Sequence, residues 1–565
     1  MNFNHTKFAL LGLIFQLSFV SLSSAQTAPG MVWVQFANKH NSLYSLQQPS
    51  EYLSSFTINR RLKEGIGFDS LDLPVNPEYV SAMIALGNME LHHKSKWFNA
   101  ATVRIVDTAM MQTTIDAIRA LSFVADVKSV TSRRFSHEID KEVGMTDTRS
   151  GGDVLEEEQE YGPSFRQISM LNGHLLHRLG YTGKGRKIAV FDAGWIRTDI
   201  LPAFGHLYEE GRIVEIKDFV SPNEIAVYGK STHGTFVLSH MAGLIPDSLI
   251  GTAPGASYYL FRTENVEGEY LVEEDNWVAA AEYADSIGVD LINSSLGYSL
   301  FDDPSMNHSY SDMNGQSTRS SIAAGIASRK GILVVNSAGN SGSSAWRYIT
   351  APSDGKGVMA VGSVNSEEQH SFFSSYGPAS DGDVKPNVMT MGEQTVFADM
   401  DSTIRKGNGT SFSAPILTGL AACLWEAFPE RSSKEIFRAI EQSAHLYFMP
   451  NDSMGHGIPD FWKAFEFLRS SNAVPAGELN VQVFPNPSNG FLSVIINQRT
   501  TESPRYEVRD YAGRLVLTGT GFTGPIDQDY YQGKIDVSSL SSGLYFLILD
   551  AGDDRSVLRF EKMTP

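Results

Sequence analysis

Four residues in the middle of the sequence have side chains that together could catalyse nucleophilic acyl transfer. They are Asp192 in VFDAG, His233 in STHGTFV, Asn340 in NSAGN and Ser411 in GTSFSAP. A serine can attack a carbonyl carbon while a histidine takes up and returns its proton, and an aspartate fixes the histidine tautomer. An asparagine side chain and the serine's backbone N–H can stabilise the oxyanion. Each residue alone is more often a turn, capping or surface residue, so the prediction rests on the four together.

The sequence around these residues predicts an α/β domain from about residue 161 to 470. Apolar stretches such as KIAVFD, SYYLFR, VDLINSSLG, GILVVNSAGN and GVMAVGSV alternate with helical stretches such as DNWVAAAEYADSIG and TRSSIAAGIASRKG. Continuous apolar strands that alternate with helices indicate a parallel sheet covered on both faces. Polar residues that follow such strands lie together at one edge of the sheet. Active and binding sites form at this edge, at the carboxyl ends of the strands.

This set of motifs resembles the subtilisin-like serine proteases, the subtilases. VFDAG, STHGTFV and GTSFSAP resemble the family's aspartate, histidine and serine motifs, and they occur in the Asp, His, Ser order of subtilisin. NSSLG, NSAGN, SFFSSYGP and VKPNV match further signatures of the family. The chain departs from the pattern at Ala193, where Ser or Thr is more common, and at Asn387, where Asp is usual. Neither departure removes a catalytic group.

The resemblance implies a three-layer fold and a role for each of the four residues. Ser411 would be the nucleophile, His233 the general base and acid, Asp192 the orienting carboxylate and Asn340 the oxyanion donor. Substrate would lie as an extended strand along one segment, Ser295, Leu296 and Gly297, with Asn265–Tyr270 as a weaker candidate for the same role. A second substrate segment, Ser337, Ala338 and Gly339, would line the pocket for the side chain before the scissile bond.

Two groups of residues near this site have simpler interpretations. Thr410 is expected to cap the helix that carries Ser411, and Pro415 suits its first turn. Three glutamates, Glu264, Glu267 and Glu269, are expected to lie on a solvated loop. The alternative is that they give the site a preference for basic substrate residues.

Composition and the N-terminal residues indicate an exported protein of two to four domains. The 565 residues include 64 acidic and 45 basic side chains, and the net charge of −19 argues against nucleic acid as a partner. Lys7, the apolar run from Phe8 to Val20 and small residues up to Ala25 predict a signal peptide at 1–25. No later stretch has the length of a transmembrane segment. The single cysteine, Cys423, lies in LAACLW and is expected to be a buried structural thiol.

Residues 26–150 form a first block of mixed strand and helix character. MVWVQFANK and VADVKSVTSR resemble strands, and QTTIDAIRALSFV has helical periodicity. The block resembles the propeptide of exported subtilases, which inhibits the enzyme and assists its folding; a permanent accessory domain is the alternative. An exposed connector, DTRSGGDVLEEEQEYG, follows it. His92 and His93 are adjacent on an expected strand, so their side chains should face opposite ways, which argues against a metal site.

After a linker at 471–479, residues 480–565 predict a small all-β sandwich. Short strands alternate with Gly, Asn and Pro turns. FPNPSNG, DYAGRLV and LSSGLYFLIL resemble the C-terminal sorting domains of Bacteroidetes proteins exported by the type IX secretion system. The resemblance implies that this machinery is a partner and that the protein is secreted or held at the outer-membrane surface. A binding module of the same fold is the alternative.

The sequence thus predicts a secreted serine endopeptidase that acts on proteins or peptides and is inhibited by its own propeptide. The rival is a noncatalytic adhesion protein on a protease scaffold, and esterase or ligase activity would use the same groups. No cofactor is required by these motifs. Structural calcium is implied only by the resemblance, since no stretch has the acidic spacing of a dedicated calcium loop.

Overall fold

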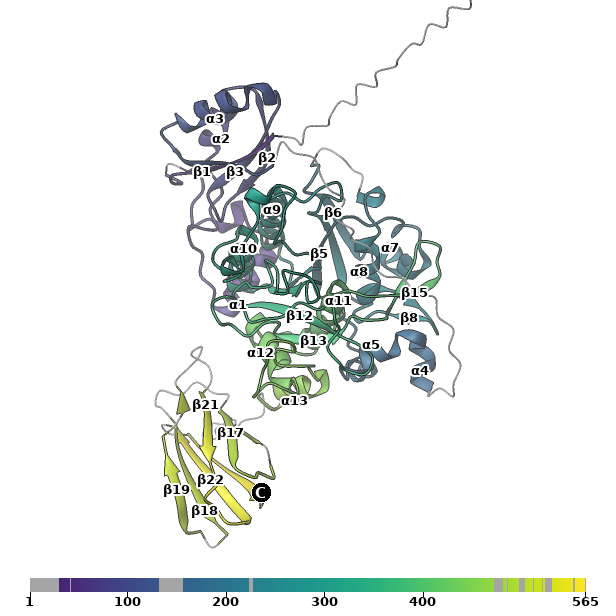
Figure 1. Ribbon diagram of the computed structural model, residues 1–565, viewed down its shortest axis with the longest axis vertical. Coiled ribbons are helices and arrows are strands. Elements are labelled where there is room, and N and C mark those ends of the chain that lie inside the picture. Colours follow the sequence, from purple (N-terminus) through teal and green to yellow (C-terminus); the bar gives the residue numbers. More distant parts are fainter. Residues whose placement is uncertain are drawn as a thin grey trace, which may run out of the picture.

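The computed structural model describes three successive parts of the chain (Figure 1). The described residues are 30–40, 42–131, 156–222, 227–471, 481–484, 486–496, 504–511, 513–520, 522–523, 531–551 and 554–563. The expected signal peptide, most of the connector at 147–162 and most of the linker at 471–479 lie outside them.

The central part is built on a seven-stranded parallel sheet with the order β13-β12-β11-β10-β5-β9-β6. The five apolar stretches quoted above supply β5, β9, β10, β11 and β12, so the parallel sheet is confirmed. The strands are β5 (Lys187–Asp192), β6 (Ile213–Asp218), β9 (Ser257–Arg262), β10 (Leu291–Ser294), β11 (Leu333–Ser337), β12 (Val358–Val364) and β13 (Val388–Met391).

Helices cover both faces of this sheet, which gives three layers. Successive residues of a strand point to opposite faces. Ile188 and Val190 therefore pack in a core with α8 and α11, whereas Ala189 and Phe191 pack in a second core with α9 and α10. The four helices are α8 (His233–Ala242), α9 (Val272–Ile287), α10 (Arg319–Arg329) and α11 (Thr410–Ala427).

Smaller elements complete the central part. They are α4 (Glu156–Tyr161), α5 (Phe165–Ser169), α6 (His174–Arg178), α7 (Gly205–Glu209), α12 (Ser433–Ser443), α13 (Phe461–Ser471), the ribbon of β7 (Leu244–Ile245) with β8 (Leu249–Ile250), and the hairpin of β14 (Thr395–Ala398) with β15 (Ile404–Gly407). Across the described part of the chain, no helix combines the length and the apolar character needed to cross a membrane.

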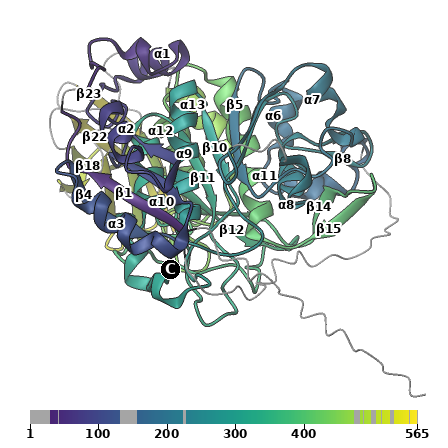
Figure 2. The same cartoon turned by 90° about the horizontal axis from the view of Figure 1, so that it is seen from above.

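The first part is an antiparallel sheet of four strands in the order β2-β3-β1-β4. Figures 1 and 2 show it beside α9 and α10 of the central part. Its elements are β1 (Gly30–Phe36), β2 (Met89–Ser95), β3 (Ala100–Ile105), β4 (Val124–Ser129), α1 (Ser55–Glu64), α2 (Pro77–Ile84) and α3 (Met111–Arg119).

The contact between the first part and α9 buries charged side chains. The carboxylate of Glu282 accepts hydrogen bonds from Ser95 Oγ at 2.5 Å, from Lys96 N at 2.6 Å and from Trp97 N at 3.0 Å. Asp285 of α9 is fully buried and pairs with Arg61 at 2.7 Å. Burial alone would raise the pKa of Asp285, but nearby cationic groups, Lys96 and Arg61 foremost, lower it to about 2. The acidic face of α9 is therefore an interface.

His92 and His93 do not face opposite ways, so that expectation is wrong. The pairing of β2 with β3 shifts register between Leu91 and His93, and this irregularity breaks the alternation of side chains. The two rings lie 4.0 Å apart between centroids. Nε2 of His92 and Nε2 of His93 both approach Asn276 Oδ1 of α9, at 3.2 and 3.0 Å. The pair belongs to the interface between the first two parts.

The third part consists of two four-stranded sheets that share one core, as predicted for a β-sandwich. Leu492 and Ile535 of one sheet pack with Val508, Leu547 and Phe560 of the other. One sheet contains β16 (Val481–Phe484), β17 (Phe491–Ile496), β21 (Tyr531–Asp536) and β20 (Phe522–Thr523); the other contains β19 (Leu515–Gly519), β18 (Arg505–Asp510), β22 (Gly543–Ala551) and β23 (Asp554–Lys562).

Candidate active site

Asp192 and His233 form a hydrogen-bonded pair at the edge of the central sheet. Asp192 is the last residue of β5 and is fully buried, and His233 is the first residue of α8. Nδ1 of His233 lies 2.8 and 3.0 Å from the two carboxylate oxygens of Asp192. Oδ1 of Asp192 also accepts from the N–H of Ala193 at 2.7 Å. The carboxylate is thus fixed by its own backbone and holds the ring through one nitrogen.

The loops that carry this pair approach each other at a glycine. A Cβ atom on Gly234 would lie 2.4 Å from the carbonyl oxygen of Gly194 and 2.9 Å from Trp195 Nε1. A larger residue after His233 would therefore push α8 away from the loop that follows Asp192. Arg262 supports the same loop by donating from Nε to the carbonyl of Ala193 at 3.1 Å.

Ser411 lies in the first turn of α11, where the helix has an unusual hydrogen bond. Pro415 is the sixth residue of α11 and has no N–H to donate to the carbonyl of Ser411, four residues earlier. Ser295 Oγ donates to that carbonyl instead, at 2.9 Å. Ser411 Oγ donates in turn to the carbonyl of Ser295 at 3.3 Å. As the sixth residue of α11, Pro415 lies beyond the first turn, so the expectation that it belongs to that turn is wrong. Because it leaves the carbonyl of Ser411 without a donor from the helix, that carbonyl is free to bind Ser295.

Thr410 orients Asn340 and does not cap α11. The residue before the helix is Gly409, and it makes no side-chain cap bond. The backbone N–H and the hydroxyl of Thr410 both donate to Asn340 Oδ1, each at 2.9 Å. A Cβ on Gly409 would lie 3.8 Å from Asn340 Nδ2 and 3.7 Å from Ser411 N, so these two nitrogens border the same small space. The sequence pattern does not indicate this role, because a threonine before a helix is usually a cap.

The two expected substrate segments lie side by side on neighbouring strands. Ser295, Leu296 and Gly297 follow β10, while Ser337 ends β11 and leads to Ala338 and Gly339. Asn336 Nδ2 donates to the carbonyl of Leu296 at 3.0 Å and joins the segments. The third candidate, Asn265–Tyr270, contains no strand.

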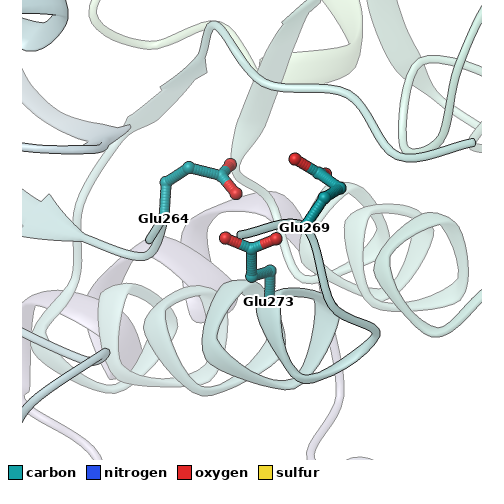
Figure 3. Close-up of side chains that lie close together, drawn as sticks. All are labelled: Glu264, Glu269 and Glu273. Carbon is teal, nitrogen blue, oxygen red and sulfur yellow. The ribbon is translucent and has the colours of Figure 1, made fainter. Parts of the chain in front are cut away.

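Three glutamates beside this region are clustered and buried (Figure 3). Carboxylate oxygens of Glu264, Glu269 and Glu273 lie within 4.8 Å of one another. A solvated loop is therefore the wrong expectation for Glu264 and Glu269, although Glu267 is exposed. Glu273 accepts from the backbone N–H of Asn265 at 2.8 Å and of Tyr270 at 3.1 Å. Such oxygen donors suit a hard cation such as Ca²⁺.

Cys423 and Asn387 are both structural. Cys423 is buried in α11, and burial raises the pKa of its thiol well above the usual value, as expected for an inert cysteine. Asn387, one of the two departures from the family pattern, accepts from the backbone N–H of Ala360 at 3.0 Å and donates to Glu441 at 3.0 Å.

Comparison with protein families assigns each of the three parts. Residues 183–457 match the subtilase family. Residues 31–143 match the peptidase S8 propeptide domain of Bacteroidota, and residues 482–560 match the secretion system C-terminal sorting domain.

Curated relatives of the central part are proteases. Subtilisin-like protease SBT6.1 of Arabidopsis thaliana is 28% identical over 316 residues, which cover 54% of this chain and 28% of that protein. Subtilisin DY of Bacillus licheniformis is 28% identical over 279 residues, which cover 49% of this chain and 90% of subtilisin DY. A solved structure, MycP1 from the ESX-1 type VII secretion system, matches 59% of this chain and 94% of its own at 20% identity, with a TM-score of 0.42.

The fold, the order of the motifs and the family matches lead to one conclusion. A Bacteroidota S8 propeptide precedes residues 183–457, and a secretion sorting domain follows them. Through residues 183–457, the chain belongs to the subtilase family of serine peptidases.

Proposed function

We propose that the protein is a secreted endopeptidase that hydrolyses peptide bonds through Asp192, His233 and Ser411. The observation that carries the proposal is the bond of His233 Nδ1 to the buried Asp192, which leaves Nε2 as the nitrogen that faces the reaction. Ser411 and His233 are both partly exposed, as a nucleophile and its base must be. The rings of His233 and Phe412 are nearly parallel, and their centroids are 6.5 Å apart. The starts of α8 and α11 therefore lie next to each other.

In this mechanism Ser411 Oγ attacks the substrate carbonyl while Nε2 of His233 takes the serine proton. Asp192 stabilises the imidazolium that forms. The developing oxyanion accepts hydrogen bonds from Asn340 Nδ2 and the backbone N–H of Ser411, the two donors that border the space at Gly409. His233 then protonates the leaving amine, and water hydrolyses the acyl-enzyme by the reverse proton transfers.

The first part would act as the inhibitor of this site. Its sheet covers α9, and the N–H of Val272, the first residue of that helix, donates to the carbonyl of Val130 at 3.0 Å. We further propose the domain limits 26–150, 161–470 and 480–565, with a signal peptide at 1–25. Sorting by the third part would deliver the enzyme to the medium or the cell surface.

Calcium remains the cofactor that the family implies. Glu264, Glu269 and Glu273 would hold such an ion against the start of α9, where its two positive charges would offset two of the three negative charges. No catalytic step depends on it.

Hydrolysis of an unstructured protein tests the proposal. Casein incubated with the processed full-length protein should yield new peptide termini, identified by mass spectrometry, and Ser411→Ala should lower the rate by roughly 10⁶-fold, as for the nucleophile of subtilisin. A folded protein that produces no new termini from any substrate would favour the adhesion protein. Cleavage of esters alone would favour the esterase.

A further inference from the structure

Lys385 is a buried lysine in the loop that leads into β13, at the edge of the central sheet. Only 3% of its surface is exposed. Its Nζ donates to three oxygens, the carbonyls of Gly355 at 3.2 Å and Val358 at 2.7 Å and Oδ1 of Asn387 at 3.1 Å. All three acceptors are neutral, so none of them offsets the charge of a buried ammonium group. Burial lowers the pKa of Lys385 to about 8, which makes the neutral, nucleophilic amine accessible.

The side-chain amide of Asn387 is held so that its carbon is polarised. Oδ1 accepts from the backbone N–H of Ala360 at 3.0 Å as well as from Lys385. Two donors on this oxygen would stabilise the negative charge that develops when a nucleophile adds to Cγ. The backbone N–H of Asn387 donates to the carbonyl of Ala360 at 2.8 Å, which fixes the residue in place. An aspartate here, the usual residue of the family pattern, would form an ion pair with Lys385 instead.

The nitrogen of the same amide faces a carboxylate. Nδ2 of Asn387 donates to Oε1 of Glu441, in α12, at 3.0 Å. Nε2 of His456 lies 3.5 Å from this oxygen of Glu441. A carboxylate beside an amide nitrogen can deliver the proton that the nitrogen needs in order to leave. An amine, a polarised amide carbon and a proton carrier therefore lie together, among residues that the proposed mechanism of hydrolysis does not use.

We propose that Lys385 and Asn387 become joined by an intramolecular isopeptide bond, with Glu441 as the proton carrier. Nζ of the neutral Lys385 adds to Cγ of Asn387; the Nζ–Cγ bond forms, the Cγ–Nδ2 bond breaks, and Nδ2 leaves as ammonia. One proton passes from Nζ to Nδ2 through Glu441, and no oxidant or reductant takes part. The product keeps Oδ1 as an acceptor for Ala360 and replaces a buried charge with a neutral amide. This modification does not depend on the proposed peptidase function.

Mass spectrometry of the full-length Ser411→Ala protein, which cannot digest itself if Ser411 is the nucleophile, tests the inference. Trypsin does not cleave between Lys385 and Pro386, so Lys385 and Asn387 stay together in the peptide 357–405. We expect this peptide to be lighter than its sequence by the mass of one ammonia molecule. Its fragment spectrum should lack ions from cleavage between residues 385 and 387, because the new ring holds the two halves together. A peptide of unmodified mass from the folded protein would overturn the inference.

Three further variants in the same Ser411→Ala background separate this reaction from other losses of ammonia. Lys385→Met leaves Asn387 able to close a ring on its own backbone, so a mass deficit that persists in this variant would overturn the inference. Glu441→Gln should slow the linkage by roughly 10²-fold, the contribution of a positioned proton carrier, and leave freshly purified protein mostly unlinked. Glu430→Gln, at an exposed position before α12, should be linked as fully as the parent protein. Equal linkage in the two glutamate variants would overturn the role of Glu441.

Discussion

In the proposed mechanism, the hydroxyl of Thr410 orients the oxyanion donor beside Ser411. It donates to Asn340 Oδ1 and accepts from the backbone N–H of Gly339 at 3.2 Å. The amide of Asn340 is otherwise exposed, so these contacts decide which way its NH₂ group points. Electrostatic stabilisation depends on donors that are oriented before the reaction begins.

We expect Thr410→Val to lower kcat about 10-fold with little change in KM. Loss of the whole asparagine donor costs roughly 10²–10³-fold in subtilisin, and the variant only loosens that donor. Steady-state kinetics on a peptide substrate measure the effect. Thr410→Ser keeps the hydroxyl and should retain most of the activity; an equal loss in both variants would contradict this role.

At the scale of elements, α11 depends on a bond from outside the helix. Pro415 interrupts its ladder, and Ser295 supplies the missing donor for the Ser411 carbonyl. The combination links the helix of Ser411 to the segment that follows β10. A sequence pattern shows the proline but not the partner, which lies more than 100 residues earlier in the chain.

Ser295→Ala should lower the free energy of unfolding by about 1–3 kcal/mol, because a carbonyl in the helix loses its donor. Adding Pro415→Ala should recover part of the loss, since an alanine at 415 can donate to the carbonyl four residues before it. Denaturant unfolding of the four proteins in a Ser411→Ala background, which prevents self-digestion, gives the coupling energy. Strictly additive effects would show that the two residues act separately.

The interface between the first part and α9 depends on a buried ion network. Asp285 pairs with Arg61 and Lys96, and Arg61 pairs with Asp72 at 2.6 Å. Removing one partner of a buried pair costs about 3–5 kcal/mol. We expect Asp285→Asn to release the cleaved first part much faster after self-processing, as measured by size-exclusion chromatography. Asp116→Asn, at an exposed position of α3, should behave as the wild type.

The same interface should respond to pH through His92 and His93. Burial lowers the pKa of His92 to about 4 and that of His93 to about 3, and the charge of His92 is a further cause for His93. Lowered pKa values favour the neutral rings in the intact interface, so their contribution is complete above about pH 6.5 and falls as the pH drops towards 4. Burial raises the pKa of Glu282 to about 6, which works in the opposite direction.

Comparison of the wild type with His92→Gln/His93→Gln isolates the histidines from Glu282. The ratio of the release rate at pH 5 to the release rate at pH 7 should be higher in the wild type than in the double variant. If the release of the first part changes with pH equally in both proteins, the carboxylates and not the histidines cause the pH dependence.

At the scale of the whole molecule, the sequence predicted the elements better than the contacts between them. The strands of the central sheet were found because buried parallel strands are continuous apolar runs. The acidic start of α9 and the glutamates near it suggest solvent, yet Glu273, Glu282 and Asp285 are buried because other segments cover them. His92 and His93 converge through a register shift that no local pattern encodes. The residues proposed for catalysis follow from their motifs, whereas Thr410 acts through contacts that depend on the fold.

Labelling with a fluorophosphonate probe, combined with intact mass before and after incubation, tests the central claim most directly. We expect the probe to react with Ser411, as located by peptide mapping, only in protein that has lost its first part. Ser411→Ala should neither react nor lose that part. A correctly folded and processed protein that takes no label would contradict the assignment of Asp192, His233 and Ser411 as a catalytic triad.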